Sequence, residues 1–206
     1  MMSRRATHEQ RRLDIVEATW RIIARGGFAA ATMREIAAEA GFANGGLKHY
    51  FASKDELLAA AFQHTFFRIN ERAGRTIGDA TGLEAVRLLC LEMLPLDEER
   101  DVESRVTVAF WDRAAASTQL MKIHADSYAI WRTWMEQHLQ KARMSGELDP
   151  SVSDGQFIDE LLCLSAGLKV LTLPDPKTAP TVDPVRLLDA MLERARAPRP
   201  ASYPVG

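Results

Sequence analysis

Hydrophobic residues recur every three or four positions along most of this chain, which is the period of an amphipathic α-helix. The first such stretch, from His8 to Arg25, places Leu13, Val16 and Trp20 on one stripe. No run alternates hydrophobic and polar residues as a half-buried strand does. The pattern therefore predicts an all-α fold. The predicted helices cover residues 8–25, 33–40, 44–51, 54–75, 83–94, 98–116, 118–144, 156–172 and 184–197.

Several predicted helix starts carry a hydroxyl residue followed three positions later by Glu or Gln. In this capping box the hydroxyl and the longer side chain each accept a hydrogen bond from an otherwise unpaired backbone N–H. Asp183 followed by Pro184 is a further start signal, because proline fits the first helical position. We expect Gly26, Gly27 and Gly41 to end helices. The capping-box hydroxyls belong to Thr7, Thr32, Ser53, Thr81 and Ser153.

The stretch 156–172 is hydrophobic on nearly every face, so as a helix it needs partners on all sides. The longest hydrophobic run, Leu161–Leu173, has about 13 residues and contains Lys169. A helix that crosses a bilayer needs about 18 to 20. We therefore expect no membrane contact. The Pro-rich tail, 198–206, is expected to be disordered.

Charge is unevenly distributed along the 206 residues, whose net charge is −2. Residues 1–54 hold nine basic and five acidic side chains, or +4, and the rest of the chain carries the balance of −6. This asymmetry indicates that only the N-terminal part meets a polyanion, although chance clustering would look the same.

The cysteines and the N-terminal residues indicate the cellular compartment of the protein. Cys90 and Cys163 are isolated in hydrophobic helical stretches and make no disulfide framework. The opening residues, MMSRRATHEQ, lack the hydrophobic stretch of a signal peptide. We expect a cytoplasmic protein.

The predicted helices 33–40 and 44–51 are joined by three residues that begin with Gly41, which is a helix-turn-helix layout. On the second helix, Leu47, Tyr50 and Phe51 share one face and can pack against the first helix. The opposite face has no carboxylate, and its donors and its cation suit phosphates and base edges in a major groove. That face carries Asn44, Gly45, Lys48 and His49.

Gly45 and Gly46 open the second helix, although a glycine inside a helix costs about 1 kcal/mol relative to alanine. Without side chains, their backbone N–H groups could approach a phosphate closely at the helix N-terminus. Lys54 lies in the first turn of the next predicted helix, where a cation opposes the helix dipole. A nearby phosphate would explain it, and an ordinary solvated lysine is the alternative.

These residues resemble the TetR family of bacterial transcription regulators over about residues 8–58. The resemblance implies a homodimer whose recognition helices enter adjacent major grooves of a palindromic operator, and a larger C-terminal helical domain that holds an effector pocket and the dimer interface. The matching positions are Thr32, Ile36, Ala37, Ala40, Gly41, Gly45, Leu47, His49, Tyr50, Phe51, Ser53, Lys54 and Leu57. By that pattern the DNA-binding residues are Thr32, Arg34, Asn44, Gly45, Gly46, Lys48, His49, Tyr50 and Lys54.

Two positions depart from the family pattern. Ala43 stands where Ser or Thr usually caps the recognition helix, and Asn44 could cap one residue later. Lys48 replaces a usual aromatic residue, which should alter operator preference or strengthen phosphate binding. The C-terminal half resembles more loosely the BetI subgroup, through RVTVAFWDRA at 105–114 and CLSAGL at 163–168. Lys169 follows where that subgroup tends to have an aromatic residue, and its charge argues against a quaternary ammonium ligand such as choline.

Aromatic residues cluster on the helices expected to surround the pocket. Some could line a ligand cavity, and core packing is the alternative for each of them. His64, Asp112 and His124 are further polar candidates. The candidate ligand-binding residues are Phe62, Phe66, Trp111, Tyr128, Trp131 and Lys169.

The sequence thus predicts a repressor with a helix-turn-helix DNA-binding domain, 1–53, and a helical ligand-binding and dimerisation domain, 54–197. Its partners would be double-stranded operator DNA, an unidentified small-molecule effector and a second copy bound through the last two helices. No enzyme motif, catalytic residue, cofactor or metal site is expected. A helical ligand-binding or adaptor protein without DNA binding is the alternative.

Overall fold

The computed structural model describes residues 4–43, 45–172 and 182–198. Within these ranges the chain forms helices and no strand, apart from an isolated bridge between Leu148 and Arg196, and the all-α prediction is confirmed. The elements are α1 (Arg4–Ala30), α2 (Met33–Glu39), the 3₁₀-helix η1 (Gly46–His49), α3 (Lys54–Ile77), α4 (Gly82–Met93), α5 (Glu98–Ala114), α6 (Thr118–Met144), α7 (Asp154–Leu171) and α8 (Pro184–Ala195).

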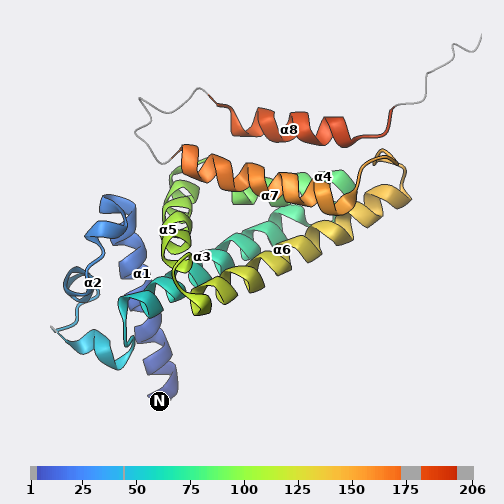
Figure 1. Ribbon diagram of the computed structural model, residues 1–206. Coiled ribbons are helices and arrows are strands. Elements are labelled where there is room, and N and C mark those ends of the chain that lie inside the picture. The colour runs from blue at the N-terminus through green and yellow to red at the C-terminus, as the bar shows by residue number, and fades with distance from the viewer. Residues whose placement is uncertain (1–3, 44, 173–181, 199–206) are drawn as a thin grey trace, which may run out of the picture.

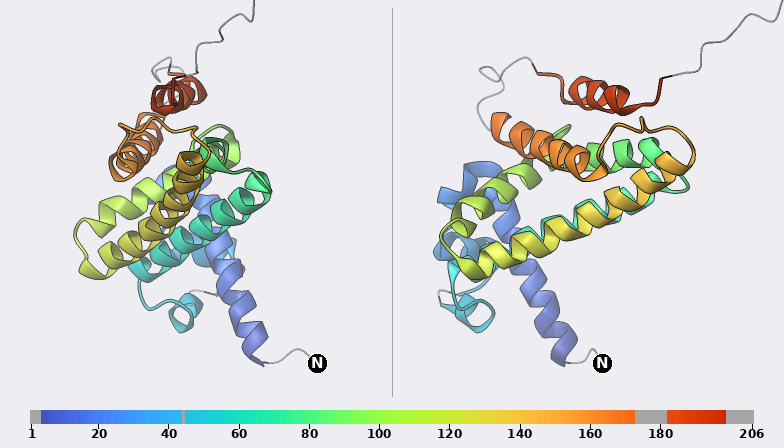
Figure 2. Two further views of the ribbon diagram at one scale, coloured as in Figure 1. Left: turned by 90° about the vertical axis from the view of Figure 1, so that its right-hand side faces the viewer. Right: turned by 45° about the vertical axis from the view of Figure 1, so that its right-hand side comes forward.

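The helices form a small N-terminal group and a larger body (Figure 1). Helices α1, α2 and η1 make up the small group, and α3 leads from it into the body. Helix α8 lies outermost, packed on α4 and α7, at the end of the molecule opposite the first turns of α1 (Figure 2). The predicted recognition segment and the last two helices therefore lie at opposite ends of the subunit.

The core of the N-terminal group extends into the body. Leu47 and Phe51 are fully buried there beside Ile36 of α2. Leu57 of α3 and Val106 of α5 belong to the same cluster, so the group is held by α3 and α5 as well as by its own helices. The predicted recognition segment, which we also call the reading segment, is thus anchored on helices that also form the body.

An ion-pair network of buried carboxylates and partly buried guanidinium groups joins α3, α4 and α5. Arg72 of α3 donates two hydrogen bonds to the carboxylate of Glu103, at 2.6 and 2.7 Å, and one to Glu92 at 3.0 Å. Arg100 donates to Glu92 at 2.8 Å. Burial raises the pKa of Glu103, whereas at Glu92 the hydrogen bonds from Arg100 and Arg72 outweigh burial and lower the pKa. The network fixes α3, the element that leaves the N-terminal group, against the body.

The predicted helix starts are confirmed in part. Thr32 and Ser53 accept hydrogen bonds from Glu35 N and Glu56 N, and Asp183 caps α8 ahead of Pro184. Thr81 and Ser153 precede helices, but their side chains make no capping hydrogen bond. Thr7 was predicted to cap the first helix and instead lies inside it, since α1 already begins at Arg4.

The first helical stretch breaks at Gly27, as predicted, but a second stretch follows the kink directly, and the two together make up α1. Gly27 has a left-handed φ of 68°, which breaks the α-helical path, and helical residues resume and reach Ala30. No helix in the described part of the chain is both long and hydrophobic enough to cross a bilayer. The tail predicted to be disordered, 198–206, lies outside the described residues from 199 onward.

Candidate nucleic-acid interface and ligand pocket

The predicted second helix of the helix-turn-helix differs from expectation. The sequence predicted an α-helix over 44–51, and the structure has the four-residue 3₁₀-helix η1 instead. Gly45 precedes it with a left-handed φ of 89°, which an α-helix does not allow. A Cβ at Gly46 would lie 3.4 Å from Phe42 Cδ1, at the close end of ordinary van der Waals contact, so the turn packs against the phenyl ring. Asn44 lies outside the described residues.

The two faces of this segment are separated as the sequence predicted. Leu47 is buried in the core, whereas Lys48 and His49 are exposed. A hollow of about 490 Å³ lies beside Lys48, and no carboxylate is among the described residues that line it. The lining residues are Met33, Arg34, Gly45, Leu47, Lys48, Ala52, Ser53 and Lys54. The structure thus gathers three cations around one solvent-facing hollow.

Four of the described residues predicted to bind DNA do not line this hollow, namely Thr32, Gly46, His49 and Tyr50. Thr32 is exposed but lines a different hollow, between α1 and α2, and its hydroxyl caps α2. His49 is exposed and does not line the cationic hollow. The half-buried Tyr50 stacks its ring on His8 of α1 at a centroid distance of 4.8 Å. Tyr50 therefore also has a structural role in joining α1 to the turn.

Lys54 has a partner inside the subunit that sequence reasoning missed. Its Nζ lies 4.1 Å from the centroid of the Phe28 ring and 3.5 Å from the Phe28 carbonyl oxygen. This cation–π contact holds the ammonium at the rim of the hollow. The aromatic residue directly after Gly27 was the available signal, but its distance from Lys54 in sequence hid the pairing.

Arg12 is a second residue that the sequence did not single out. Its guanidinium donates to the Tyr50 carbonyl oxygen and lies 4.1 Å from the centroid of the Phe51 ring. It also pairs with Glu56 at 3.6 Å. Arg12 thereby fixes the end of η1 against α1 and α3.

A pocket of about 320 Å³ lies between α5, α6 and α7. Two of the predicted ligand residues, Trp111 and Tyr128, line it, and His124 lies between them. The His124 ring is 6.0 Å from Trp111 and 4.3 Å from Tyr128, measured between centroids. Burial lowers the pKa of His124 and raises that of Tyr128 to about 12, so both side chains are uncharged near neutral pH. The other lining residues are Ala114, Ala115, Met121 and Ala166.

The other predicted aromatic residues lie in the core instead. Phe62 stacks on Phe110 at a centroid distance of 4.0 Å. Trp131 is buried and donates from Nε1 to Asn70 Oδ1 at 2.8 Å, and Phe66 packs on its ring. For these three residues the structure favours the packing alternative over a place in the pocket wall.

Lys169 is also absent from the residues that line the aromatic pocket. It is 3% exposed, and its ammonium donates to the carbonyl oxygen of Met93 and to Ser165 Oγ. Burial lowers the pKa of Lys169 to about 8. Lys169 therefore holds the C-terminal end of α4 against α7.

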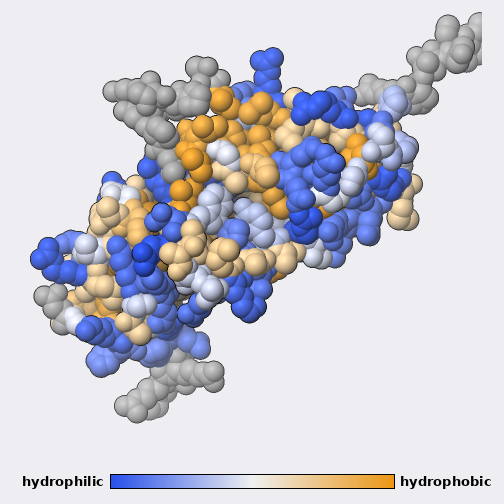
Figure 3. Space-filling view, in the orientation of Figure 1, coloured by the Kyte–Doolittle hydropathy of each residue, from blue (hydrophilic) through white to orange (hydrophobic). Residues whose placement is uncertain are grey.

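One side of α7 and α8 is open in the single subunit. Val170, Leu171 and Leu187 are between 41% and 49% exposed, and Cys163 is exposed as well. Hydrophobic surface gathers around α7 in the space-filling view (Figure 3). The sequence predicted that the helix over 156–172 needs packing partners on all sides. Within one subunit, only one side of this helix is covered.

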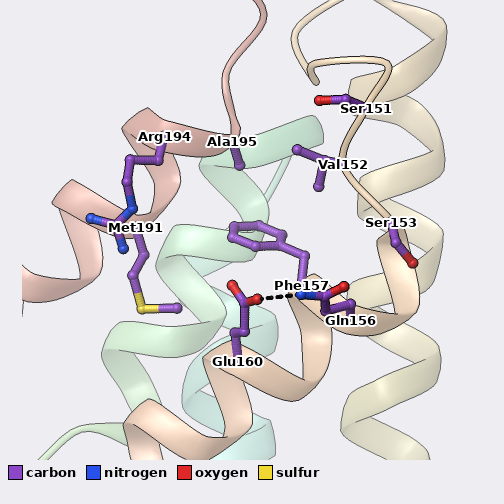
Figure 4. Close-up of a pocket in the computed structure, with 9 residues that line it drawn as sticks. All are labelled: Ser151, Val152, Ser153, Gln156, Phe157, Glu160, Met191, Arg194 and Ala195. Carbon is purple, nitrogen blue, oxygen red and sulfur yellow. Dashed lines mark hydrogen bonds between the residues drawn. The ribbon is translucent and has the colours of Figure 1, made fainter.

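A shallow pocket separates α7 from α8 near the loop before α7 (Figure 4). Phe157 and Glu160 of α7 face Met191 and Arg194 of α8 across it, and Gln156 donates to Glu160 at 3.0 Å. No group of three or more His, Cys, Asp or Glu side chains that could hold a metal occurs in the described part of the chain.

Comparison with family models gives two matches. Residues 15–61 match the model described as bacterial regulatory proteins of the tetR family. Residues 82–197, more than half of the chain, match the C-terminal domain of BetI-type transcriptional repressors. Most of α3 lies between the two matched ranges of the sequence.

Individual proteins agree with the family models. The chain is 41% identical over 110 residues to the regulator PksA of Bacillus subtilis, covering 53% of this chain and 54% of PksA, so it spans about half the length of that relative. A transcriptional regulator from Rhodococcus sp. Rha1 has 26% identity and a TM-score of 0.76, over 89% of this chain and 95% of that one. A regulator from Saccharomonospora viridis in complex with choline shares the fold, with 20% identity and a TM-score of 0.82 over 93% and 100% of the two chains.

Proposed function

This chain belongs to the TetR family of bacterial regulatory proteins, and we propose that it is a repressor that binds a palindromic DNA operator as a homodimer and leaves it when a small molecule binds. The observation that carries this proposal is the hollow beside η1, where Arg34, Lys48 and Lys54 surround an exposed glycine backbone. No described residue that lines this hollow is a carboxylate, and Arg34 pairs beside it with Glu35 at 3.3 Å. The family consists of regulators, so the proposal assigns the chain no catalysis.

The DNA-reading role rests on how η1 is held. Leu47 and Phe51 anchor its inner side in the core, so the outer side presents Lys48 and His49 at a fixed angle. A cation next to bare backbone N–H groups suits phosphate oxygens, and a long side chain such as Lys48 can reach a base edge in the major groove. Because operator DNA lies in the bacterial cytoplasm, the proposal places the protein there.

The homodimer would form through α7 and α8. The exposed hydrophobic side chains on these helices support this role, because two copies could cover them in a four-helix bundle. This surface lies at the end of the subunit opposite the first turns of α1, so it leaves the predicted recognition segment free to meet DNA (Figure 1).

The proposed functions fall on two consecutive parts of the chain. We assign DNA binding to residues 1–53 and effector binding with dimerisation to 54–197. The pocket lined by Trp111, His124 and Tyr128 lies in the second part and is our candidate for the effector site. Effector binding would favour a dimer whose reading segments are spaced wrongly for the operator, which takes a coupling free energy of about 1–3 kcal/mol.

Selection of bound sequences from a random duplex library tests the proposal. Ligand-free protein should retain a two-fold symmetric sequence with half-sites about one helical turn apart, or a multiple of it. The exposed Lys141 in the last turn of α6 gives a matched control, since that end of α6 lies away from the N-terminal group (Figure 1), and Lys141→Ala should select the same sequence. Recovery of no enriched sequence by the dimeric protein would contradict the proposal and favour a ligand-binding or adaptor protein without DNA binding.

A further inference from the structure

The aromatic pocket between α5, α6 and α7 has walls without charge. Among the described residues that line it there is neither a carboxylate nor a lysine or arginine. Asp112 is the neighbour of Trp111 in sequence, but it is exposed and does not line the pocket. A charged ligand would therefore lose part of its hydration in this pocket without meeting an opposite charge.

The rings of the pocket are in contact with one another. His124 lies 4.3 Å from Tyr128 at an angle of 33° between the ring planes, so it covers part of one face of the phenol. Trp111 and His124 meet edge to face, at 82°. An organic cation binds to the electron-rich faces of aromatic rings and is repelled by their edges. Faces already occupied by neighbouring rings are less available to an ammonium group.

The remaining walls are small or adaptable hydrophobic side chains. Ala114, Ala115 and Ala166 leave space, and Met121 is 54% exposed and can adjust its shape to a ligand. At about 320 Å³ the pocket is at the small end of the usual range for ligand sites, which is roughly 300–1,000 Å³. These walls suit a compact hydrocarbon body.

We propose that this pocket takes a small uncharged molecule, mainly hydrocarbon with at most one or two hydroxyl or carbonyl groups, in preference to a quaternary ammonium ion. Its neutral imidazole and phenol can exchange hydrogen bonds with such a polar group. That this molecule is the effector rests on the proposed function, but its binding does not.

Two isosteric probes separate the alternatives. 4-tert-Butylphenol and the 4-hydroxyphenyl-trimethylammonium ion differ in one central atom, carbon or charged nitrogen. Ligand-observed NMR titration of the intact protein, without DNA, should show the phenol binding at least about tenfold more tightly, since the desolvated charge is uncompensated. Equal binding, tighter binding of the ammonium ion, or no binding of either probe would overturn the inference.

A charge introduced at the pocket should reverse the preference. Met121→Glu places a carboxylate among the lining residues and should weaken the phenol and strengthen the ammonium ion. Met144→Glu is the matched control, because Met144 is 88% exposed at the other end of α6 and should leave both affinities unchanged. Equal effects of the two substitutions would assign the binding to another site. If the phenol binds the protein but does not cause it to leave operator DNA, the repressor mechanism is contradicted and the pocket assignment stands.

Discussion

The guanidinium of Arg113 donates two hydrogen bonds to the carboxylate of Asp55, at 3.0 Å from Nε and 2.9 Å from Nη2. Arg113 lies in the last turn of α5, two residues after Trp111 of the aromatic pocket. Asp55 lies in the first turn of α3, directly after Lys54 of the cationic hollow. This ion pair therefore joins the surroundings of the two sites that the proposed function connects.

Substitution of this pair should uncouple the two sites. Both side chains are more than 40% exposed, so Asp55→Asn and Arg113→Gln should leave the melting temperature nearly unchanged. For a typical coupling, ligand binding changes operator affinity about 5- to 150-fold. Each substitution should make this change several-fold smaller. The measurement is operator affinity with and without 4-tert-butylphenol in both single variants and the double variant. A ligand effect that stays at the wild-type value in all three variants would exclude this route.

Lys48 and Lys54 should differ in what they contribute to DNA binding. Lys48→Ala should change which operator sequences are retained in a selection experiment, because we assign its exposed side chain to base edges. Lys54→Ala should weaken binding to all duplexes about equally and reduce the salt slope by about 1, as loss of a phosphate contact does. An unchanged sequence preference in the first variant, or a loss confined to one operator in the second, would contradict the assigned roles.

Substitution of Gly45 should destabilise the folded protein although this residue is exposed. Its φ of 89° is strained for an L-residue, so Gly45→Ala should cost about 1–2 kcal/mol of unfolding free energy. Gly74 is the matched control, because it is exposed inside α3 and a Cβ there would meet no atom within 4 Å. Gly74→Ala should stabilise by about 0.5–1 kcal/mol. Urea unfolding of both variants measures this, and changes of the same sign would show that the left-handed backbone does not matter.

Lys169 should make the stability of the protein depend on pH. Its pKa is about 8 in the folded protein, below the ordinary value of 10.5, so between these values the unfolded chain binds the proton more tightly. Lys169 should therefore contribute an increase in folding stability as the pH rises from about 8 to about 10.5, and Lys169→Met should lack this contribution. Burial raises the pKa of the neighbouring Cys90 from 9.0 to about 12, so Cys90 lowers folding stability above about pH 9 in both proteins, and the role of Lys169 is the difference between their two pH profiles. Urea unfolding of both proteins at the two ends of the window gives the comparison, and parallel pH profiles would contradict a low pKa at Lys169.

Much of the fold could be predicted from local pattern. Stripes of hydrophobic residues predicted each α-helix of the structure, and the hydroxyls of Thr32 and Ser53 marked starts that the structure confirms. These features depend on neighbours within one or two helical turns, and the sequence shows such neighbours directly. The inward face of the reading segment was predictable for the same reason.

The misplaced candidates depended on contacts between distant parts of the chain. Trp131 hydrogen-bonds Asn70 and Lys169 hydrogen-bonds Met93, and neither pairing leaves a periodic signal. A buried lysine is rare, so a solvent-facing or pocket position was the natural expectation from sequence. The 3₁₀ geometry of η1 follows from the backbone angles at Gly45, which the two glycines made available but did not specify.

The salt dependence of operator affinity tests the central claim most directly. Ligand-free protein is titrated with its selected duplex and with a scrambled duplex between about 50 and 200 mM salt. The account predicts a preference of about 10³-fold or more for the selected duplex, and affinity that falls steeply with salt as phosphate counterions are released. Equal affinity for both duplexes at every salt concentration would contradict the claim that η1 and its cationic hollow read operator DNA.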